Sequence, residues 1–203
     1  MKTFGAFLTP CLLFALLAPA RAVQPMDQIQ STAERVLSIL RDPAQAGDPH
    51  RSERQRLIGV ELDRSFDWKS LARACLGRHW LKRTPAEQQE FADVFGRLLK
   101  RTYTDLFDTH YADLDKVVYQ SQRIIENYAS VKVLVITKEK VEHPVEFRLE
   151  KSVAGEDWRV YDVLIEGVSL VKNYRDQFDE ILAKSSYPKL LQDLQSKVEA
   201  GGG

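Results

Sequence analysis

The spacing of hydrophobic residues along the chain changes from a helical period to an alternating one and then back again. Between Asp27 and Leu40, apolar residues recur every three or four positions, which predicts an amphipathic helix. Prolines and a glycine within 43–49 end that pattern, and a charged helix is predicted over 51–66. A short helix is predicted next, with Asp67 as its N-cap and Gly77 where it ends.

The strongest helix signal lies in the middle of the chain. Thr84, Pro85 and Glu87 have the spacing of a capping box with proline at the first helical position. The apolar residues that follow fall at steps of three and four: Phe91, Val94, Phe95, Leu98, Leu99, Tyr103, Leu106, Phe107 and Tyr111. This stripe predicts one helix of about 40 Å with a broad aromatic face, a pattern that is most often plain core.

Beyond Asp115 apolar residues alternate with polar ones, which predicts four strands in an antiparallel meander, over 116–126, 128–138, 143–152 and 157–167. A helical period returns over 168–184 and again over 187–198. This order predicts an α+β fold, in which a twisted four-stranded antiparallel sheet packs with N-terminal and C-terminal helices. We expect one domain over 23–200 and a flexible tail over 201–203.

The predicted sheet has more apolar surface than one covered face requires. The third strand alternates cleanly between apolar and charged residues, but the second and fourth carry apolar groups on both faces. In the fourth strand the two predicted sets are Tyr161, Val163 and Ile165 on one face and Val160, Asp162 and Leu164 on the other. The second face therefore needs either more helices, closing the core, or a cavity that holds an apolar ligand.

The first 22 residues have the features of a secretory signal peptide. Lys2 is followed by an uncharged apolar run and by small residues that suit cleavage after Ala20 or Ala22. A retained membrane anchor is the alternative, but Pro10 interrupts the run, which is short for a span. Cleavage would leave Cys75 as the lone cysteine, so we expect no internal disulfide and a buried, unreactive thiol.

Composition and motifs argue against nucleic-acid binding and catalysis. The chain has 29 basic and 29 acidic residues, without the basic excess of nucleic-acid-binding domains. Its 4 histidines lie in separate segments without metal-ligand spacing, and no phosphate-binding loop motif occurs. The context of Ser169 is like that of a nucleophile elbow but lacks the second glycine, so a serine hydrolase is the least favoured function. We expect a protein that is not an enzyme, with no cofactor and no metal.

Two blocks of sequence resemble the MlaC family, also called toluene-tolerance auxiliary proteins. The blocks are 66–107 and 158–178, and the resemblance spans about Phe66 to Leu194. Its markers are Leu76-Gly77 before Trp80, Thr84-Pro85 at the start of a helix, Tyr161-Asp162-Val163, Glu166-Gly167-Val168-Ser169, Asn173-Tyr174-Arg175 and Gln177-Phe178. Many members have a Leu-Pro pair before the short helix near Asp67, and this chain lacks it.

The resemblance implies a periplasmic phospholipid carrier of Gram-negative bacteria. Family members shuttle lipid between an outer-membrane lipoprotein complex and an inner-membrane ABC transporter complex that contains an MCE-domain protein. The acyl chains lie between the twisted sheet and the helices, with bound phospholipid as cargo rather than cofactor. We expect a monomer. The alternative, from another functional class, is a periplasmic adaptor or chaperone whose groove holds a peptide or a lipidated protein.

The residues expected to line the pocket follow from periodicity, because the family has no catalytic residues to transfer. They are Tyr103, Leu106, Phe107, Val133, Val135, Phe147, Leu149, Tyr161, Val163 and Ile165, and ordinary core packing is the alternative for each. In the turn that follows, Gly167 is predicted to supply backbone freedom and Ser169 to cap the next helix. Glu166 is predicted to lie near the positive end of that helix, with partner docking as the alternative.

Overall fold

The computed structural model of the protein describes residues 23–152 and 157–200. The α-helices are α1 (Pro25–Arg41), α2 (Arg51–Ser65), α3 (Trp68–Leu76), α4 (Pro85–His110), α5 (Leu170–Lys184) and α6 (Tyr187–Ala200). Short 3-10 helices are η1 (Pro43–Gln45), η2 (Asp48–His50), η3 (Gly77–Lys82) and η4 (Tyr111–Asp113). The strands are β1 (Leu114–Ile125), β2 (Tyr128–Thr137), β3 (Glu142–Lys151), β4 (Trp158–Ile165) and β5 (Val168–Ser169). The predicted signal peptide and the tail over 201–203 lie outside the described residues.

The α+β fold is confirmed, and so are the predicted N-caps Thr84 and Asp67, whereas the helix predicted from Val168 begins at Leu170. At α4, the Thr84 hydroxyl accepts from the Glu87 backbone N–H (3.3 Å), and the Glu87 carboxylate accepts from the Thr84 backbone N–H (2.7 Å). At α3, the Asp67 carboxylate accepts from the Ser70 N–H (2.8 Å), and Gly77 follows the helix with a φ of 55°. These caps satisfy N–H groups that the helices leave unpaired, which is why the local sequence was sufficient to place them.

The sheet has five antiparallel strands in the order β1-β2-β3-β4-β5, so the prediction of four strands was one short. The added strand arises because Glu166 and Gly167 both have positive φ values, 51° and 81°, and reverse the chain within two residues. Val168 then pairs with Ile165 before α5 begins. Such turns favour glycine because it has no Cβ to clash at positive φ, which confirms the role predicted for Gly167.

A β-bulge in β4 changes which residues share a face. Leu149 pairs with Val160, and the preceding residue of β3, Arg148, pairs with Asp162, so β4 holds one extra residue, Tyr161. Val160 and Val163 consequently pack in the same hydrophobic cluster on one face of the sheet. Tyr161 lies outside that cluster and contacts the ring of Tyr128, with centroids 6.1 Å apart. The prediction that Tyr161 and Val163 share a face was therefore wrong, because strict alternation does not survive a bulge.

Charged residues occupy the other face of the middle strands. Lys132 and Glu146 are opposite each other in β2 and β3, with Nζ and Oε2 3.9 Å apart. Arg148 lies 3.6 Å from Glu146 and 3.5 Å from Asp162. The middle of this sheet face is thus ion-paired and suits contact with water.

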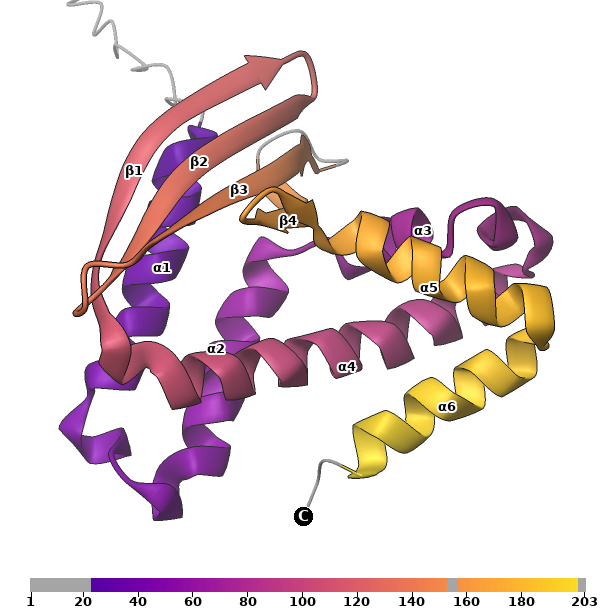
Figure 1. Ribbon diagram of the computed structural model, residues 1–203, viewed down its shortest axis with the longest axis horizontal. Helices are drawn as coiled ribbons and strands as arrows, with labels where there is room; N and C mark the ends of the chain where they lie inside the picture. Colours follow the sequence, from indigo (N-terminus) through magenta and orange to yellow (C-terminus); the bar gives the residue numbers. More distant parts are fainter. Residues whose placement is uncertain (1–22, 153–156, 201–203) are drawn as a thin grey trace, which may run out of the picture.

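Two main cores hold the fold together, and Figure 1 shows how their elements separate. The helical core is formed by α3, α4, α5 and α6 together with η3, and the sheet core lies between the sheet and α1. The buried residues of the sheet core are Ile29, Ala129, Val131, Val133, Leu149, Trp158 and Val160. A smaller cluster joins α1 to α2. Phe66 packs against all three clusters and stacks on Trp68 at 4.9 Å, so it lies where they meet.

None of the helices within 23–152 and 157–200 combines the length and the apolar character that a membrane span requires.

Candidate functional site

The ten residues predicted to line a pocket fall into four groups. Val133 and Leu149 are completely enclosed in the sheet core, with 2% and 0% of their surfaces exposed. They pack beneath α1 with residues such as Ile29, as ordinary core packing predicts. Tyr161 forms a group of its own, because the bulge separates it from this face of the sheet.

The third group lies at the margin of the sheet core. Val135, Phe147 and Val163 pack against the core but are only partly buried. Ile165, which pairs with Val145 at the end of β4, is 40% exposed. These side chains form an apolar face that α1 covers incompletely.

The fourth group comes from the second half of α4. Leu106 is 44% exposed and Phe107 is 38% exposed, high values for residues of this size. Tyr103, one turn before Phe107, packs at the edge of the helical core near Tyr174. Burial, with a smaller contribution from Tyr174, raises the pKa of Tyr103 to about 12, so the side chain is a neutral phenol at physiological pH.

The sheet contributes three apolar residues that the prediction missed. We call the partly buried set Val117, Tyr119, Val135, Val145, Phe147 and Val163 the open apolar face. Tyr119 pairs with Val133, and Val133 pairs with Val145, so the set continues across three neighbouring strands. The alternation of Val117 with Tyr119 was a usable signal, but it did not show that β1 neighbours β2 on this face. Burial of Tyr119 raises its pKa, consistent with an apolar environment.

A buried carboxylate joins β4 to α5. Asp162, 2% exposed, accepts from the Ser169 hydroxyl (2.8 Å) and from the Val171 backbone N–H (3.0 Å). Ser169 in turn accepts from the Lys172 N–H (3.0 Å), which confirms it as the N-cap of α5. Glu166, predicted to lie near this helix end, forms an ion pair with His143 (2.8 Å). The arrangement anchors α5 to the sheet, and its serine is engaged as a cap rather than by a histidine base.

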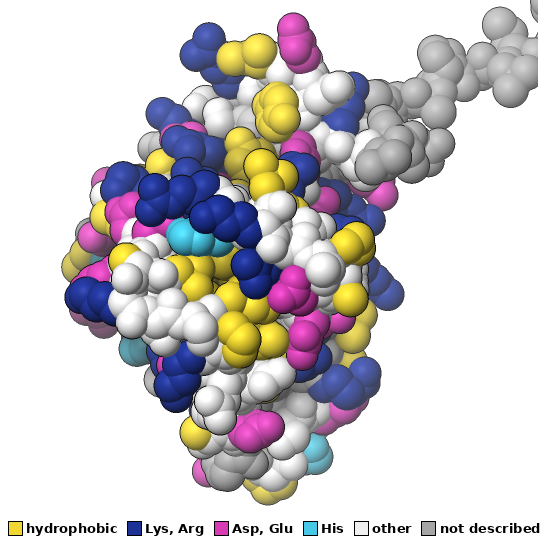
Figure 2. Space-filling view, turned by 90° about the vertical axis from the view of Figure 1, so that its right-hand side faces the viewer, with side chains coloured by type: hydrophobic (Ala, Val, Ile, Leu, Met, Phe, Trp, Pro, Cys, Tyr) yellow, Lys and Arg dark blue, Asp and Glu magenta, His cyan; other side chains and the backbone are white. Residues whose placement is uncertain are grey.

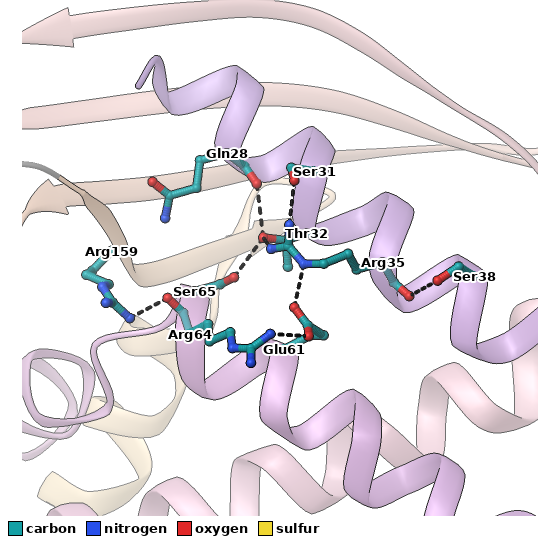
Figure 3. A network of polar contacts seen from close by, with 9 residues as sticks. All are labelled: Gln28, Ser31, Thr32, Arg35, Ser38, Glu61, Arg64, Ser65 and Arg159. Atoms are coloured by element: carbon teal, nitrogen blue, oxygen red, sulfur yellow. Dashed lines mark hydrogen bonds and ion pairs between the residues drawn. The ribbon is translucent and has the colours of Figure 1, made fainter. Parts of the chain in front are cut away.

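A polar pocket of about 490 Å³ lies between α1 and α2 (Figure 3). Glu61 lies between two arginines, 2.5 Å from Arg35 and 2.7 Å from Arg64. The Thr32 and Ser65 hydroxyl oxygens are 2.7 Å apart. Thr32, Arg35, Arg64 and Ser65 line the pocket, and their polar groups make it less suited to an acyl chain than an apolar cleft.

Groups with catalytic potential are scattered in the described part of the chain. No cluster of three or more His, Cys, Asp or Glu side chains there could hold a metal ion. His79 bonds Asp179 at 2.8 Å, far in sequence from the His143–Glu166 pair. Cys75 is fully buried, and burial raises the pKa of its thiol, so it has the unreactive character predicted from the sequence.

Comparison with known proteins gives a consistent result. The family described as MlaC protein matches residues 30–196. A toluene tolerance protein, ttg2D, of Pseudomonas putida is 26% identical over 194 residues, covering 94% of this chain and 85% of the relative. The intermembrane phospholipid transport system binding protein MlaC of Haemophilus influenzae is 29% identical over 128 residues, covering 61% of this chain and 58% of the relative.

A solved structure has the same fold. The phospholipid-binding protein from Ralstonia solanacearum, determined in complex with a phospholipid, superposes with a TM-score of 0.74 at 26% identity. The match covers 88% of this chain and 98% of that protein. The arrangement of sheet and helices described above is therefore shared with it.

Proposed function

Since the chain belongs to the MlaC family, we propose that it is a carrier of phospholipid in the periplasm. The acyl chains lie against the open apolar face and against Tyr103, Leu106 and Phe107 of α4. The apolar N-terminal segment supports export, with cleavage after Ala20 or Ala22. The carrier exchanges lipid with an inner-membrane ABC transporter complex containing an MCE-domain protein and with an outer-membrane lipoprotein complex.

The observation that carries this proposal is the partial exposure of large apolar side chains on the sheet and on the second half of α4. Leu106, Phe107 and Ile165 are each about two-fifths exposed, and the open apolar face is only partly buried. Exposed apolar side chains of this size cost free energy in water, and where they gather they mark a binding site on a protein surface. A lipid tail would cover them, because each buried CH₂ contributes about 0.8 kcal/mol.

The same energetics constrain how the lipid leaves. One chain of sixteen carbons would contribute on the order of 10 kcal/mol, so release into water would be far too slow for a carrier. Lipid must pass directly from this site into another apolar conduit in a docked partner. A phosphate-binding loop motif does not occur in the sequence, so net direction would come from the partner's nucleotide cycle or from the lipid gradient.

The test is lipid extraction and mass spectrometry on protein purified from the periplasm. Phospholipid in stoichiometric amount is expected from the wild type. Val163→Arg places a charge on the open apolar face and is expected to reduce the lipid content several-fold. Burying that charge under an acyl chain costs more free energy than the acyl chain gains by being buried there. The matched control is Leu164→Arg, which makes the same change at the next residue of β4, opposite Glu146 on the charged face.

Two results would contradict the proposal. Folded wild-type protein that carries a bound peptide instead of lipid would favour the adaptor function. Equal lipid content in folded Val163→Arg and wild-type protein would show that the open apolar face does not bind the lipid. Circular dichroism and a thermal melt on each variant establish that it is folded.

A further inference from the structure

One stretch of the chain is strongly basic although the whole chain has a formal net charge of +0. Residues 68–86 contain no Asp or Glu, and their cations are Lys69, Arg73, Arg78, Lys82 and Arg83. They belong to α3, to η3 and to the residues between η3 and α4. Positive charge is therefore concentrated at one end of the helical core, although the positive and negative charges of the whole chain are equal in number.

The η3 segment is held rigidly at this end. Trp80 is 5% exposed and anchors the segment in the helical core. Its carbonyl accepts from the Arg83 backbone N–H (3.0 Å) and from the Gln88 side-chain amide (3.1 Å). The positive φ of Gly77, 55°, sets the direction in which η3 leaves α3. The backbone that presents the neighbouring side chains is thus fixed before any partner binds.

Leu81 projects from this anchored backbone into solvent. It is 86% exposed, more than any other large hydrophobic side chain in the described part of the chain. Its neighbours Arg78 and Lys82 are also exposed. Figure 2 shows this end of the molecule, where Lys and Arg side chains gather beside a patch of hydrophobic ones.

The acidic residues nearby neutralise only part of this charge. Asp179 of α5 pairs with His79 (2.8 Å) and Arg78 (3.5 Å), and Glu87 of α4 forms an ion pair with Arg83 (3.3 Å). Within 23–152 and 157–200, no ion-pair partner lies within reach of Lys69, Arg73 or Lys82. We define the basic tip as Leu81 with Arg73, Arg78 and Lys82.

We propose that the basic tip docks the protein on a membrane surface that contains anionic phospholipid. The cations approach the lipid phosphates, and Leu81 enters the boundary between headgroups and acyl chains. An exposed leucine among exposed cations suits a lipid interface, which offers anionic headgroups and an apolar boundary together. The contact is weak and reversible, because few charges and one apolar side chain contribute.

This inference goes beyond the proposed cargo site and does not require it. The basic tip lies on η3 and α3, whereas the open apolar face belongs to β1–β4. Docking would hold the carrier beside a membrane complex for longer than random encounter allows. Membrane contact and lipid cargo can therefore be measured separately on the same samples.

The experiment is sedimentation of the purified protein with vesicles of phosphatidylglycerol and phosphatidylethanolamine, compared with vesicles of phosphatidylcholine alone. Binding is expected to the anionic vesicles only, and to weaken as salt screens the charges. The double variant Arg73→Glu/Lys82→Glu should bind at least roughly tenfold more weakly, since each cation near such a surface contributes several-fold. Leu81→Ser should weaken binding by a few-fold.

The matched control is Lys138→Glu/Lys197→Glu, which makes the same change in net charge at exposed lysines of the β2–β3 turn and of α6. It should bind almost like the wild type. Equal losses in both double variants would overturn the proposal, because net charge alone would then explain binding. Failure of the wild type to bind anionic vesicles would also overturn it. Mass spectrometry of the cargo in the same samples tests the proposed function independently.

Discussion

Phenylalanine side chains are enclosed in the helical core but only partly covered where they pack against the sheet core. Phe91 and Phe95 on α4 are fully buried, and Phe91 contacts the rings of Phe178 and Tyr187. Phe147 on β3 packs against the sheet core and remains partly exposed. Four helices surround the first pair, whereas α1 covers only part of the sheet face. The helical core is thus complete without a ligand, and the sheet is the region where a ligand would complete the packing.

Removing a ring from the helical core is expected to have the largest effect on stability. Phe91→Ala should lower the free energy of unfolding by about 3 to 5 kcal/mol, because a full ring is lost and a cavity remains. Urea unfolding followed by circular dichroism measures the change. A loss below about 1 kcal/mol would mean that the helical core rearranges easily and would weaken the contrast between the two regions.

The junction between the two regions is expected to show the next largest effect. Asp162→Ala leaves the Val171 N–H without its buried acceptor and should lower the free energy of unfolding by about 2 to 3 kcal/mol. Ser169→Ala removes the cap and one of the two hydrogen bonds that Asp162 accepts, and should lower it by about 1 to 2 kcal/mol. If the serine variant proved the more unstable, the cap rather than the carboxylate would hold α5 to the sheet.

Removing a ring from the sheet is expected to affect lipid binding more than stability, the opposite of what is expected for the helical core. Phe147→Ala should lower the free energy of unfolding of lipid-free protein by only about 1 to 2 kcal/mol, since part of the ring is already in water. Its lipid content should nevertheless fall, while that of any folded Phe91→Ala protein should not. Mass spectrometry and urea unfolding on both variants decide this, and equal behaviour would show that the two regions do not differ in role.

The smallest expected effect concerns Tyr103, at the edge of the helical core. Its pKa is about 12 in the folded protein, against about 10 in an unfolded chain, so the folded state retains the proton between these values. The free energy of unfolding should therefore be unaffected below pH 10 and should fall as pH rises from 10 to 12. Tyr103→Phe should reduce that fall.

Tyr187, whose pKa is also about 12, should retain part of the fall in that variant. Tyr128→Phe is a suitable control, because its side chain is 54% exposed. The ultraviolet absorbance of tyrosinate during an alkaline titration follows the ionisation directly. A Tyr103 that ionised together with exposed tyrosines would show that its surroundings are open to water.

The sequence by itself was enough for features that depend on neighbouring residues. The capping box at Thr84 and Glu87, the cap at Asp67 and the cap at Ser169 all follow from spacings of a few residues, because the bonds involved lie within one helical turn. The change from a helical to an alternating hydrophobic period located the sheet, because that pattern also depends only on neighbouring residues. The resemblance of two sequence blocks to the MlaC family was also readable without a structure, and the family match confirms it.

Only the tertiary structure decided which apolar residues remain uncovered. Val133 and Val135 stand two residues apart in β2 and look equivalent in the sequence, yet the first is 2% exposed and the second lies at the margin of the core. The difference depends on which distant elements pack over each residue, which no local pattern encodes. The extra residue at Tyr161 likewise appears only when β3 is laid beside β4. Periodicity reports that a side chain needs an apolar neighbour, whereas the packing of distant elements determines whether the protein itself supplies one.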